Sequence, residues 1–217
     1  NRGEIAVRVM RTAKAMGMKT VAVYSEADAN AQHVREADQS VCIGPAAVAE
    51  SYLGIEAILD AAQRTGADCI HPGYGFLSEN QVFASACEAH GIEFIGPPNS
   101  AIEVMGDKAR AKRAMIEAGV PCVPGYQGDD QSLAILLSEA KGVGLPVMVK
   151  AAAGGGGRGM RLVHEASELE SAIGLAQSEA QNAFGSRELI IEKAVVRPRH
   201  VEIQVFADKA GNTVYLG

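Results

Sequence analysis

The sequence predicts an α/β protein, in which a doubly wound domain with a parallel sheet precedes part of a second α/β domain. In residues 1–105, short β-branched runs alternate with amphipathic helical segments, which is the pattern of a parallel sheet with helices on both faces. A charged helical segment and a turn-rich stretch follow residue 105 and indicate a domain boundary. In the second region, a glycine-rich segment at 154–159 connects two apolar runs. A length of 217 residues suits two such domains.

The first domain is expected to open with a helix over residues 4–16, in which apolar residues recur at helical spacing before Gly17. Because the opening helix of a doubly wound domain follows a strand, we expect a further strand before Asn1 and a less stable domain without it. The other expected elements are strands at 19–24, 40–43, 68–71 and 93–95 and helices at 54–65 and 81–90.

The second domain is expected to open with a charged helix at 107–118. The stretch from Pro124 to Asp130 is rich in turn residues and is interpreted as a linker or surface loop. The chain has no initiator Met, and residues 215–217 have the pattern of the middle of a strand, so both ends have the character of cut ends. The remaining elements are helices at 131–141 and 166–183, strands at 147–151, 160–163 and 189–193, and an antiparallel pair at 201–206 and 213–216.

Composition and charge exclude several classes of protein. The net charge is −6 without any run of like charges, which predicts neither a nucleic-acid partner nor an anionic-membrane partner. No apolar stretch approaches the roughly 18 to 20 residues of a membrane span, and no secretory signal is recognisable, so a cytoplasmic protein is expected. The cysteines are widely spaced, unlike metal ligands or disulfide partners, and are interpreted as small buried hydrophobic residues: Cys42, Cys69, Cys87 and Cys122.

The strongest local feature is the glycine-rich segment after the expected strand that ends near Lys150. Residues 154–159 contain five glycines in six positions, so that backbone N–H groups can approach a ligand closely. Such N–H groups converge on phosphate oxygens in known sites, and a lysine supplies a point charge to the same polyphosphate. The segment is not a Walker A loop, because no Gly-Lys-Ser/Thr follows. The alternative is a flexible hairpin tip with a solvated lysine.

The glycine-rich segment with its lysine resembles the nucleotide-covering hairpin of the ATP-grasp superfamily. Four further segments match motifs of biotin carboxylases in chain order. They are residues 1–6 (NRGEIA), 71–80 (HPGYGFLSEN), 105–108 (MGDK) and 198–204 (PRHVEIQ). Any one of these motifs is weak evidence, whereas four in order are specific. The chain is therefore similar to biotin carboxylases over essentially its whole length.

The resemblance implies a set of ATP-binding residues. Two are lysines, two are glycines of the loop, four form the hinge that recognises adenine, and one is a histidine near the C-terminus. They are Lys108, Lys150, Gly156, Gly157, Glu192, Lys193, Ala194, Val195 and His200. From the residues alone, the favoured interpretation of Lys108 is exposed surface, and that of the hinge is an ordinary strand end. His200 is expected on the polar face of an alternating strand, with Glu202 and Gln204.

The resemblance also implies the reaction and its participants. Biotin carboxylases use ATP to convert bicarbonate to carboxyphosphate and then carboxylate biotin on a carrier domain, for use by a carboxyltransferase component. Residues 1–105 correspond to their N-terminal, pre-ATP-grasp domain, and 106–217 to the first part of the ATP-grasp domain, with a nucleotide lid at about 122–195. Catalytic residues and the ligands of magnesium (or manganese) are expected beyond residue 217, so this polypeptide alone is predicted to be inactive. A homodimer is possible, and the location is cytoplasmic, or the mitochondrial matrix in a eukaryote.

Two other functions stay open at this point. Another ATP-grasp ligase, such as a carbamoyl-phosphate synthetase or a carboxylate–amine ligase, would share the nucleotide hairpin. A non-catalytic ATP-binding module would share it too. The segment from His71 to Asn80 is not expected in the rival ligases in this form, and we assign it no catalytic role, because no partner for His71 as a general base is identifiable. The acyl-CoA or keto acid that the parent enzyme carboxylates is not predicted.

Overall fold

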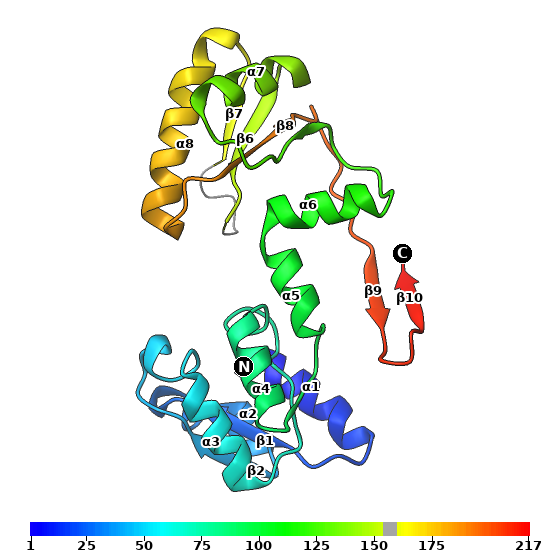
Figure 1. Ribbon diagram of the computed structural model, residues 1–217. Coiled ribbons are helices and arrows are strands. Elements are labelled where there is room, and N and C mark those ends of the chain that lie inside the picture. The colour runs from blue at the N-terminus through cyan, green and yellow to red at the C-terminus, as the bar shows by residue number, and fades with distance from the viewer. Residues whose placement is uncertain (154–159) are drawn as a thin grey trace. The chain divides into compact units, whose positions relative to one another are not determined.

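The computed structural model describes residues 1–153 and 160–217 (Figure 1). The chain forms two compact units, Asn1–Ala114 and Met115–Gly217, which divide within helix α6 (Lys108–Glu117). The boundary that the sequence suggests, near residue 105, precedes this division. The mixed α/β class is confirmed. In the described part of the chain, no helix has both the length and the apolar character that crossing a bilayer requires.

The first unit contains two separate pairs of parallel strands. Strand β1 (Val21–Tyr24) pairs with β2 (Gln39–Cys42), and β3 (Cys69–Ile70) pairs with β4 (Glu93–Phe94). Each of these strands overlaps one of the strands expected from the sequence. The doubly wound arrangement in one continuous sheet remains a prediction, because the described strands of this unit form two pairs.

The helices of the first unit follow recognisable end signals. The Asn80 side chain accepts a hydrogen bond from Phe83 N at 2.9 Å and caps α4, and Asp107 Oδ1 accepts one from Arg110 N at 2.9 Å in the first turn of α6. Helices α2 and α5 were not expected. The bounds are α1 (Gly3–Ala15), α2 (Gln32–Glu36), α3 (Ile55–Thr65), α4 (Gln81–Ala89), α5 (Asn99–Gly106) and α6, with 3₁₀ turns η1 (Glu26–Asp28) and η2 (Val48–Glu50).

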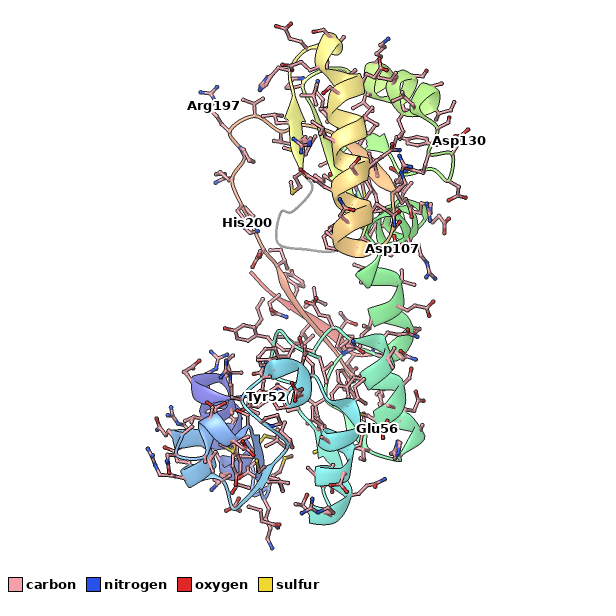
Figure 2. The ribbon with its side chains drawn as sticks, turned by 90° about the vertical axis from the view of Figure 1, so that its left-hand side faces the viewer. Tyr52, Glu56, Asp107, Asp130, Arg197 and His200 are labelled. Carbon is pink, nitrogen blue, oxygen red and sulfur yellow. The ribbon has the colours of Figure 1, made fainter. Side chains whose placement is uncertain are left out.

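A cluster of polar and aromatic side chains, which we call the Asp28 cluster, joins the start of the chain to the segment 71–80. It comprises Arg2, Ser25, Asp28, Tyr52 and Phe76. The Tyr52 hydroxyl, labelled in Figure 2, donates to Asp28 Oδ2 at 2.6 Å and accepts from Ser25 N at 3.0 Å. The Tyr52 and Phe76 rings stack with centroids 5.7 Å apart, and the Arg2 guanidinium lies 5.5 Å from the first ring centroid and 6.0 Å from the second.

A buried histidine joins α1 to the rest of the first unit. His33 is fully buried, and its Nδ1 accepts a hydrogen bond from Gly3 N at 3.3 Å. The proton of the neutral ring is therefore on Nε2, which has no hydrogen-bond partner among the described residues. Burial lowers the pKa of the His33 imidazole below its ordinary value of 6.5, and the charge of Asp28 opposes this shift.

The cysteines differ from the expectation of burial. Only Cys87 is buried among the four, whereas Cys69 and Cys122 are half-buried and Cys42 is exposed. The interpretation as four buried hydrophobic residues was wrong, because Cys42 lies on β2, a strand with mostly exposed side chains. None of the four forms a disulfide.

The second unit is built on a four-stranded antiparallel sheet in the order β5-β8-β6-β7. Helices α7 and α8 pack on one face of it (Figure 1), where side chains of both helices and three strands form the core. Strand β5 was missed, because the stretch from Pro124 to Asp130 was interpreted as a loop. The bounds are β5 (Gly125–Tyr126), α7 (Leu133–Val143), β6 (Val147–Ala151), β7 (Arg161–Val163), η3 (Ala166–Glu168), α8 (Leu169–Phe184) and β8 (Leu189–Lys193).

One glutamine side chain extends this sheet where β5 ends. Gln131 Oε1 accepts a hydrogen bond from Leu189 N at 2.8 Å, and Gln131 Nε2 donates to Leu189 O at 3.2 Å and to Gly128 O at 2.8 Å. Its amide thus satisfies both backbone groups of Leu189 on the side of β8 that faces β5.

The last two strands form an antiparallel hairpin, as expected. Strand β9 (Gln204–Ala207) pairs with β10 (Thr213–Leu216), from Thr213 opposite Ala207 to Leu216 opposite Gln204. All side chains of both strands are exposed. The expected start of the first strand at residue 201 was wrong, because regular pairing begins only at Gln204.

Candidate functional site

The candidate site lies on the face of the four-stranded sheet that is opposite α7 and α8. In β6, Val147, Val149 and Ala151 join the core on the helix side, so the intervening Lys150 has its side chain on the other face. In β8 the same alternation places Glu192 on that face. Lys150 is opposite Ile190 in the register, so that Glu192 is its diagonal neighbour.

The two charged side chains on this face form an ion pair. Lys150 Nζ lies 2.5 Å from Glu192 Oε2, and the exposed fractions of the two side chains are 27% and 17%. Glu192 thereby holds the lysine ammonium at one place on the sheet. An ammonium has three N–H donors, and the pair uses one of them, so Lys150 can still donate to a ligand. A positive group fixed in this manner suits an anionic ligand such as a phosphate.

The chain leaves β8 through a hinge that is fixed by backbone hydrogen bonds. Lys193 N donates to Pro124 O at 2.8 Å, and Ala194 N donates to Pro146 O at 2.9 Å. Val195 comes next, with an exposed fraction of 59%, and its N–H makes no backbone hydrogen bond within the described part of the chain. The first amide after β8 that can serve a ligand is therefore that of Val195.

The small side chain at Ala194 agrees with a role of the hinge backbone. Ala194 is 9% exposed and offers almost no surface for stacking. Lys193 differs from Lys150, because its Nζ donates to two backbone carbonyls on the helix side of the sheet, those of Gly144 and Leu145.

His200 lies on the extended segment between Arg197 and β9 (Figure 2). Its Nε2 is 3.0 Å from Glu202 Oε1, and the exposed fractions of these side chains are 83% and 81%. Residues 200–203 form no strand, so the expected alternating polar face at His200, Glu202 and Gln204 is not present in regular structure.

The structure gives less information on the other three predicted ATP-binding residues. Lys108 is the first residue of α6, in the first unit, and its side chain is exposed. Gly156 and Gly157 lie outside the described residues. The role of Lys108 stays a prediction, and so does that of the loop.

Sequence reasoning missed several groups of this site. Met148, Leu162 and Ile190 share the face of Lys150, as the strand register shows. The alternation within β6 and β8 could have identified Met148 and Ile190. The carbonyls of Pro124 and Pro146, which fix the hinge, have no signal in the sequence.

In the segment from His71 to Asn80, the hydrogen bond of the histidine is a local one within the loop. His71 Nδ1 accepts a hydrogen bond from Gly73 N at 3.0 Å, within its own loop. Burial lowers the pKa of the His71 imidazole. The loop is held through Phe76 in the Asp28 cluster.

Comparison with protein families identifies both parts of the chain. Residues 1–102 match the family described as biotin carboxylase, N-terminal domain, and residues 107–217 match the family described as carbamoyl-phosphate synthase L chain, ATP binding domain. The chain belongs to the biotin carboxylase family. The match of residues 1–102 to the biotin carboxylase N-terminal domain argues against the alternative of a carbamoyl-phosphate synthetase. Of the two matched families, only the ATP-binding domain carries the name of that enzyme. The resemblance read from the sequence motifs is thus confirmed.

Curated relatives of the biotin carboxylase family match the whole chain. Methylcrotonoyl-CoA carboxylase subunit alpha, mitochondrial, of Dictyostelium discoideum is 59% identical over 216 residues, and biotin carboxylase of Haemophilus influenzae is 54% identical over 217 residues. In both comparisons 100% of this chain is covered. The chain spans 31% of the length of the first relative and 48% of the second.

Solved structures of the family share the fold. A biotin carboxylase–β,γ-ATP complex from Campylobacter jejuni has a TM-score of 0.94 and 51% identity, covering 99% of this chain and 48% of that one. The biotin carboxylase domain dimer of Hydrogenobacter thermophilus 2-oxoglutarate carboxylase, in complex with MgADP, ADP and bicarbonate, has a TM-score of 0.91 and 48% identity. That match covers 100% of this chain and 48% of that chain.

Proposed function

We propose that this chain supplies ATP-binding residues to a biotin carboxylase, which carboxylates biotin with bicarbonate at the expense of ATP. The observation that carries the proposal is the Lys150–Glu192 ion pair, whose Glu192 lies three residues before the exposed residue Val195. A cation for phosphate then lies on β6, and a backbone donor for a base follows the neighbouring strand β8. The nucleotides named in the Campylobacter and Hydrogenobacter complexes support this assignment.

Each group of the site has a distinct task in nucleotide binding. Lys150 donates a charge-assisted hydrogen bond to a phosphate oxygen, and Glu192 keeps the ammonium in position. Val195 N–H donates to an acceptor nitrogen of the adenine ring. Lys108, His200, Gly156 and Gly157 complete the phosphate contacts in this proposal.

In the reaction that we propose, ATP phosphorylates bicarbonate to carboxyphosphate and leaves ADP. The C–O bond of carboxyphosphate then breaks to give carbon dioxide and phosphate, and the carbon dioxide adds to a ureido nitrogen of biotin, whose proton is lost to the phosphate. The residues of this chain hold the nucleotide still during phosphoryl transfer, so that positioning is their contribution to the rate.

Magnesium is named in the Hydrogenobacter complex. Among residues 1–153 and 160–217, no group of three or more His, Cys, Asp or Glu side chains is placed to hold a metal ion. We therefore assign no catalytic step to a metal ion held by these residues. We propose that the ligands of the magnesium ion lie outside this chain.

The partners follow from the same proposal. They are bicarbonate, a biotin carboxyl carrier domain and a carboxyltransferase component. A homodimer is proposed because the Hydrogenobacter domain is described as a dimer. The mitochondrial relatives extend the proposed location from the cytoplasm to the mitochondrial matrix if the source is a eukaryote.

Replacement of Lys150 tests the proposed nucleotide site. In the full-length protein, Lys150→Met should weaken ATP binding about 10- to 150-fold, since a hydrogen bond to a charged group contributes about 1.5–3 kcal/mol. The matched control is Lys141→Met on α7, an exposed lysine that should change the Kd by less than about twofold. The Kd is measured by isothermal titration calorimetry. Equal affinities of the Lys150→Met variant and the unmodified protein would remove the sheet face from the site.

A second measurement tests the reaction. The full-length protein should cleave ATP in the presence of bicarbonate, and free biotin should increase the rate. ATP binding without any such cleavage would instead support a non-catalytic ATP-binding module.

A further inference from the structure

The two lysines at the site lie on opposite faces of the sheet. Lys150 pairs with Glu192 on the face away from the helices. Lys193 is opposite Val147 in the strand register, and Val147 is a core residue beneath α7 and α8. The Lys193 side chain therefore extends toward the helix side, away from the face to which we assign the phosphates.

The Lys193 ammonium binds the turn that follows α7. Its Nζ donates to Gly144 O at 2.8 Å and to Leu145 O at 2.7 Å. Carbonyl groups at the end of a helix have no partner within the helix and carry partial negative charge, so a cation stabilises them. The hydrogen bonds of this ammonium are those to the two carbonyl oxygens, which are its acceptors in the described part of the chain.

Gly144 has the backbone conformation that this contact requires. Its φ is +80°, in the region that favours glycine, and a Cβ at this position would lie 3.8 Å from Lys193 Nζ. A side chain would therefore fit in space but strain the backbone, and relief of that strain would move the carbonyl that Lys193 binds.

Three separate attachments fix the end of β8 within two residues. The Lys193 side chain binds residues 144 and 145, Lys193 N binds Pro124 O, and Ala194 N binds Pro146 O. The two backbone hydrogen bonds lie in the plane of the sheet, whereas the Lys193 side chain binds on the face of the sheet that the helices cover. Val195 follows this fixed point directly, so its amide position depends on all three.

We propose that Lys193 is a positioning residue for base recognition: its side chain ties the end of β8 to the turn after α7 and thereby sets the Val195 amide at the adenine edge. Lys193 itself touches no phosphate. This assignment rests on the proposed function, because it presumes that a nucleotide binds along β8.

The test compares the two lysines through the base preference of the full-length protein. Dissociation constants are measured for ATP, GTP and inorganic tripolyphosphate with Lys193→Met and with Lys150→Met. Lys193→Met should weaken ATP binding about tenfold, which corresponds to the loss of one well-placed hydrogen bond, that from Val195 N–H to adenine. The dissociation constants for GTP and tripolyphosphate should change by less than about twofold. Lys150→Met should weaken all three ligands by a similar factor and keep the ATP-to-GTP ratio.

The outcomes separate the two proposals. If Lys193→Met weakens all three ligands alike, Lys193 is a phosphate contact and the positioning role is overturned. Unchanged ATP affinity in Lys193→Met overturns it as well. If Lys150→Met leaves the dissociation constants of all three ligands unchanged, the proposed nucleotide site is wrong, whatever the result for Lys193→Met.

Two further variants keep the test decisive if Lys193→Met does not fold. Lys193→Arg retains several N–H donors for the two carbonyls and should keep the ATP-to-GTP ratio within about threefold. Gly144→Ala leaves the lysine intact but moves its acceptor, and it should reduce ATP affinity selectively. A Gly144→Ala variant with unaltered base preference, or a Lys193→Arg variant that loses affinity for tripolyphosphate, would contradict the positioning role.

Discussion

Polar side chains lie inside the packing of the first unit, whereas the buried residues of the second unit are apolar in the part of the chain that the structure describes. The buried polar residues are Thr20, Ser25, His33, Ser51 and Lys112, all within Asn1–Ala114. In the second unit, the side chains of Lys150 and Glu192 lie on one face of the sheet and remain partly exposed.

The difference reflects how much regular sheet each unit contains. The first unit has two short parallel pairs and two small apolar clusters, and side-chain hydrogen bonds outside the strands, such as those of Tyr52 and His33, also join its parts. The second unit has a continuous sheet covered by two helices, and apolar packing stabilises it. Its Lys150–Glu192 ion pair lies on the other face of the sheet, where we propose that the nucleotide binds. Three changes of decreasing expected size test this comparison.

The largest effect is expected in the apolar core of the second unit. Ile173→Ala, at a position with no exposed surface on α8, should lower the free energy of unfolding by about 2–5 kcal/mol, because the transfer of the side chain is lost and a cavity remains. The matched control is Leu175→Ala on the same helix, where 51% of the residue is exposed and a change within about 0.5 kcal/mol is expected. Urea denaturation measures both. Similar losses in the two variants would show that the core does not carry this stability.

A smaller effect is expected in the Asp28 cluster. Tyr52→Phe keeps the ring stacked on Phe76 but leaves the buried Ser25 N–H without its acceptor, which should cost about 1–3 kcal/mol. Tyr74→Phe serves as the control, because Tyr74 is 67% exposed. Thermal unfolding of both variants gives the comparison, and a Tyr52→Phe protein as stable as the Tyr74→Phe protein would show that the cluster does not hold the unit together.

The third change concerns the way in which the stability of the first unit depends on pH, and His33 is the group involved. Burial holds the pKa of His33 below 6.5 in the folded state, so the unfolded state binds more protons as the pH falls. The stability that neutral His33 supports is present above pH 6.5 and is lost as the pH decreases toward its folded pKa.

The measurement is the free energy of unfolding between pH 7.5 and 4.5 in the His33→Asn variant. Its dependence on pH should be weaker than in the unmodified protein. The remaining dependence belongs in part to His71, whose pKa is also lowered by burial, and His71→Asn is the control for it. An identical pH dependence before and after the His33 change would exclude this residue as the source. The pKa of Asp28 is lowered chiefly by the Tyr52 hydrogen bond, so its contribution is lost only below pH 3.8.

The sequence predicted those elements whose local pattern agrees with their tertiary role. Strands at 147–151, 189–193 and 213–216 have the expected bounds, because apolar and β-branched runs determine them. Strand β5 was missed, since Gly125 and Tyr126 have no strand pattern and are extended only because they pair with β8. Strand β9 begins later than the alternation around His200 suggested, which shows that alternation without a pairing partner does not fix a strand.

For the candidate site, the sequence motifs propose the residues, whereas the contacts of their side chains come from the structure. Once the strands are assigned, a period of two places Lys150 and Glu192 on one face. The same period places the Lys193 side chain on the opposite face, but its acceptors could not be predicted, because Gly144 and Leu145 lie in a turn 49 and 48 residues earlier in the chain. Such a contact depends on how α7 packs and leaves no local signal.

The Gln131 amide has a consequence for the solubility of this chain. Strand β5 has only two residues and leaves the start of β8 uncovered on that side, where a free backbone edge would be a template for another strand. Gln131 occupies this edge with both of its polar atoms on Leu189. One side chain thus takes the place of a strand and blocks the edge-to-edge pairing through which β-proteins aggregate.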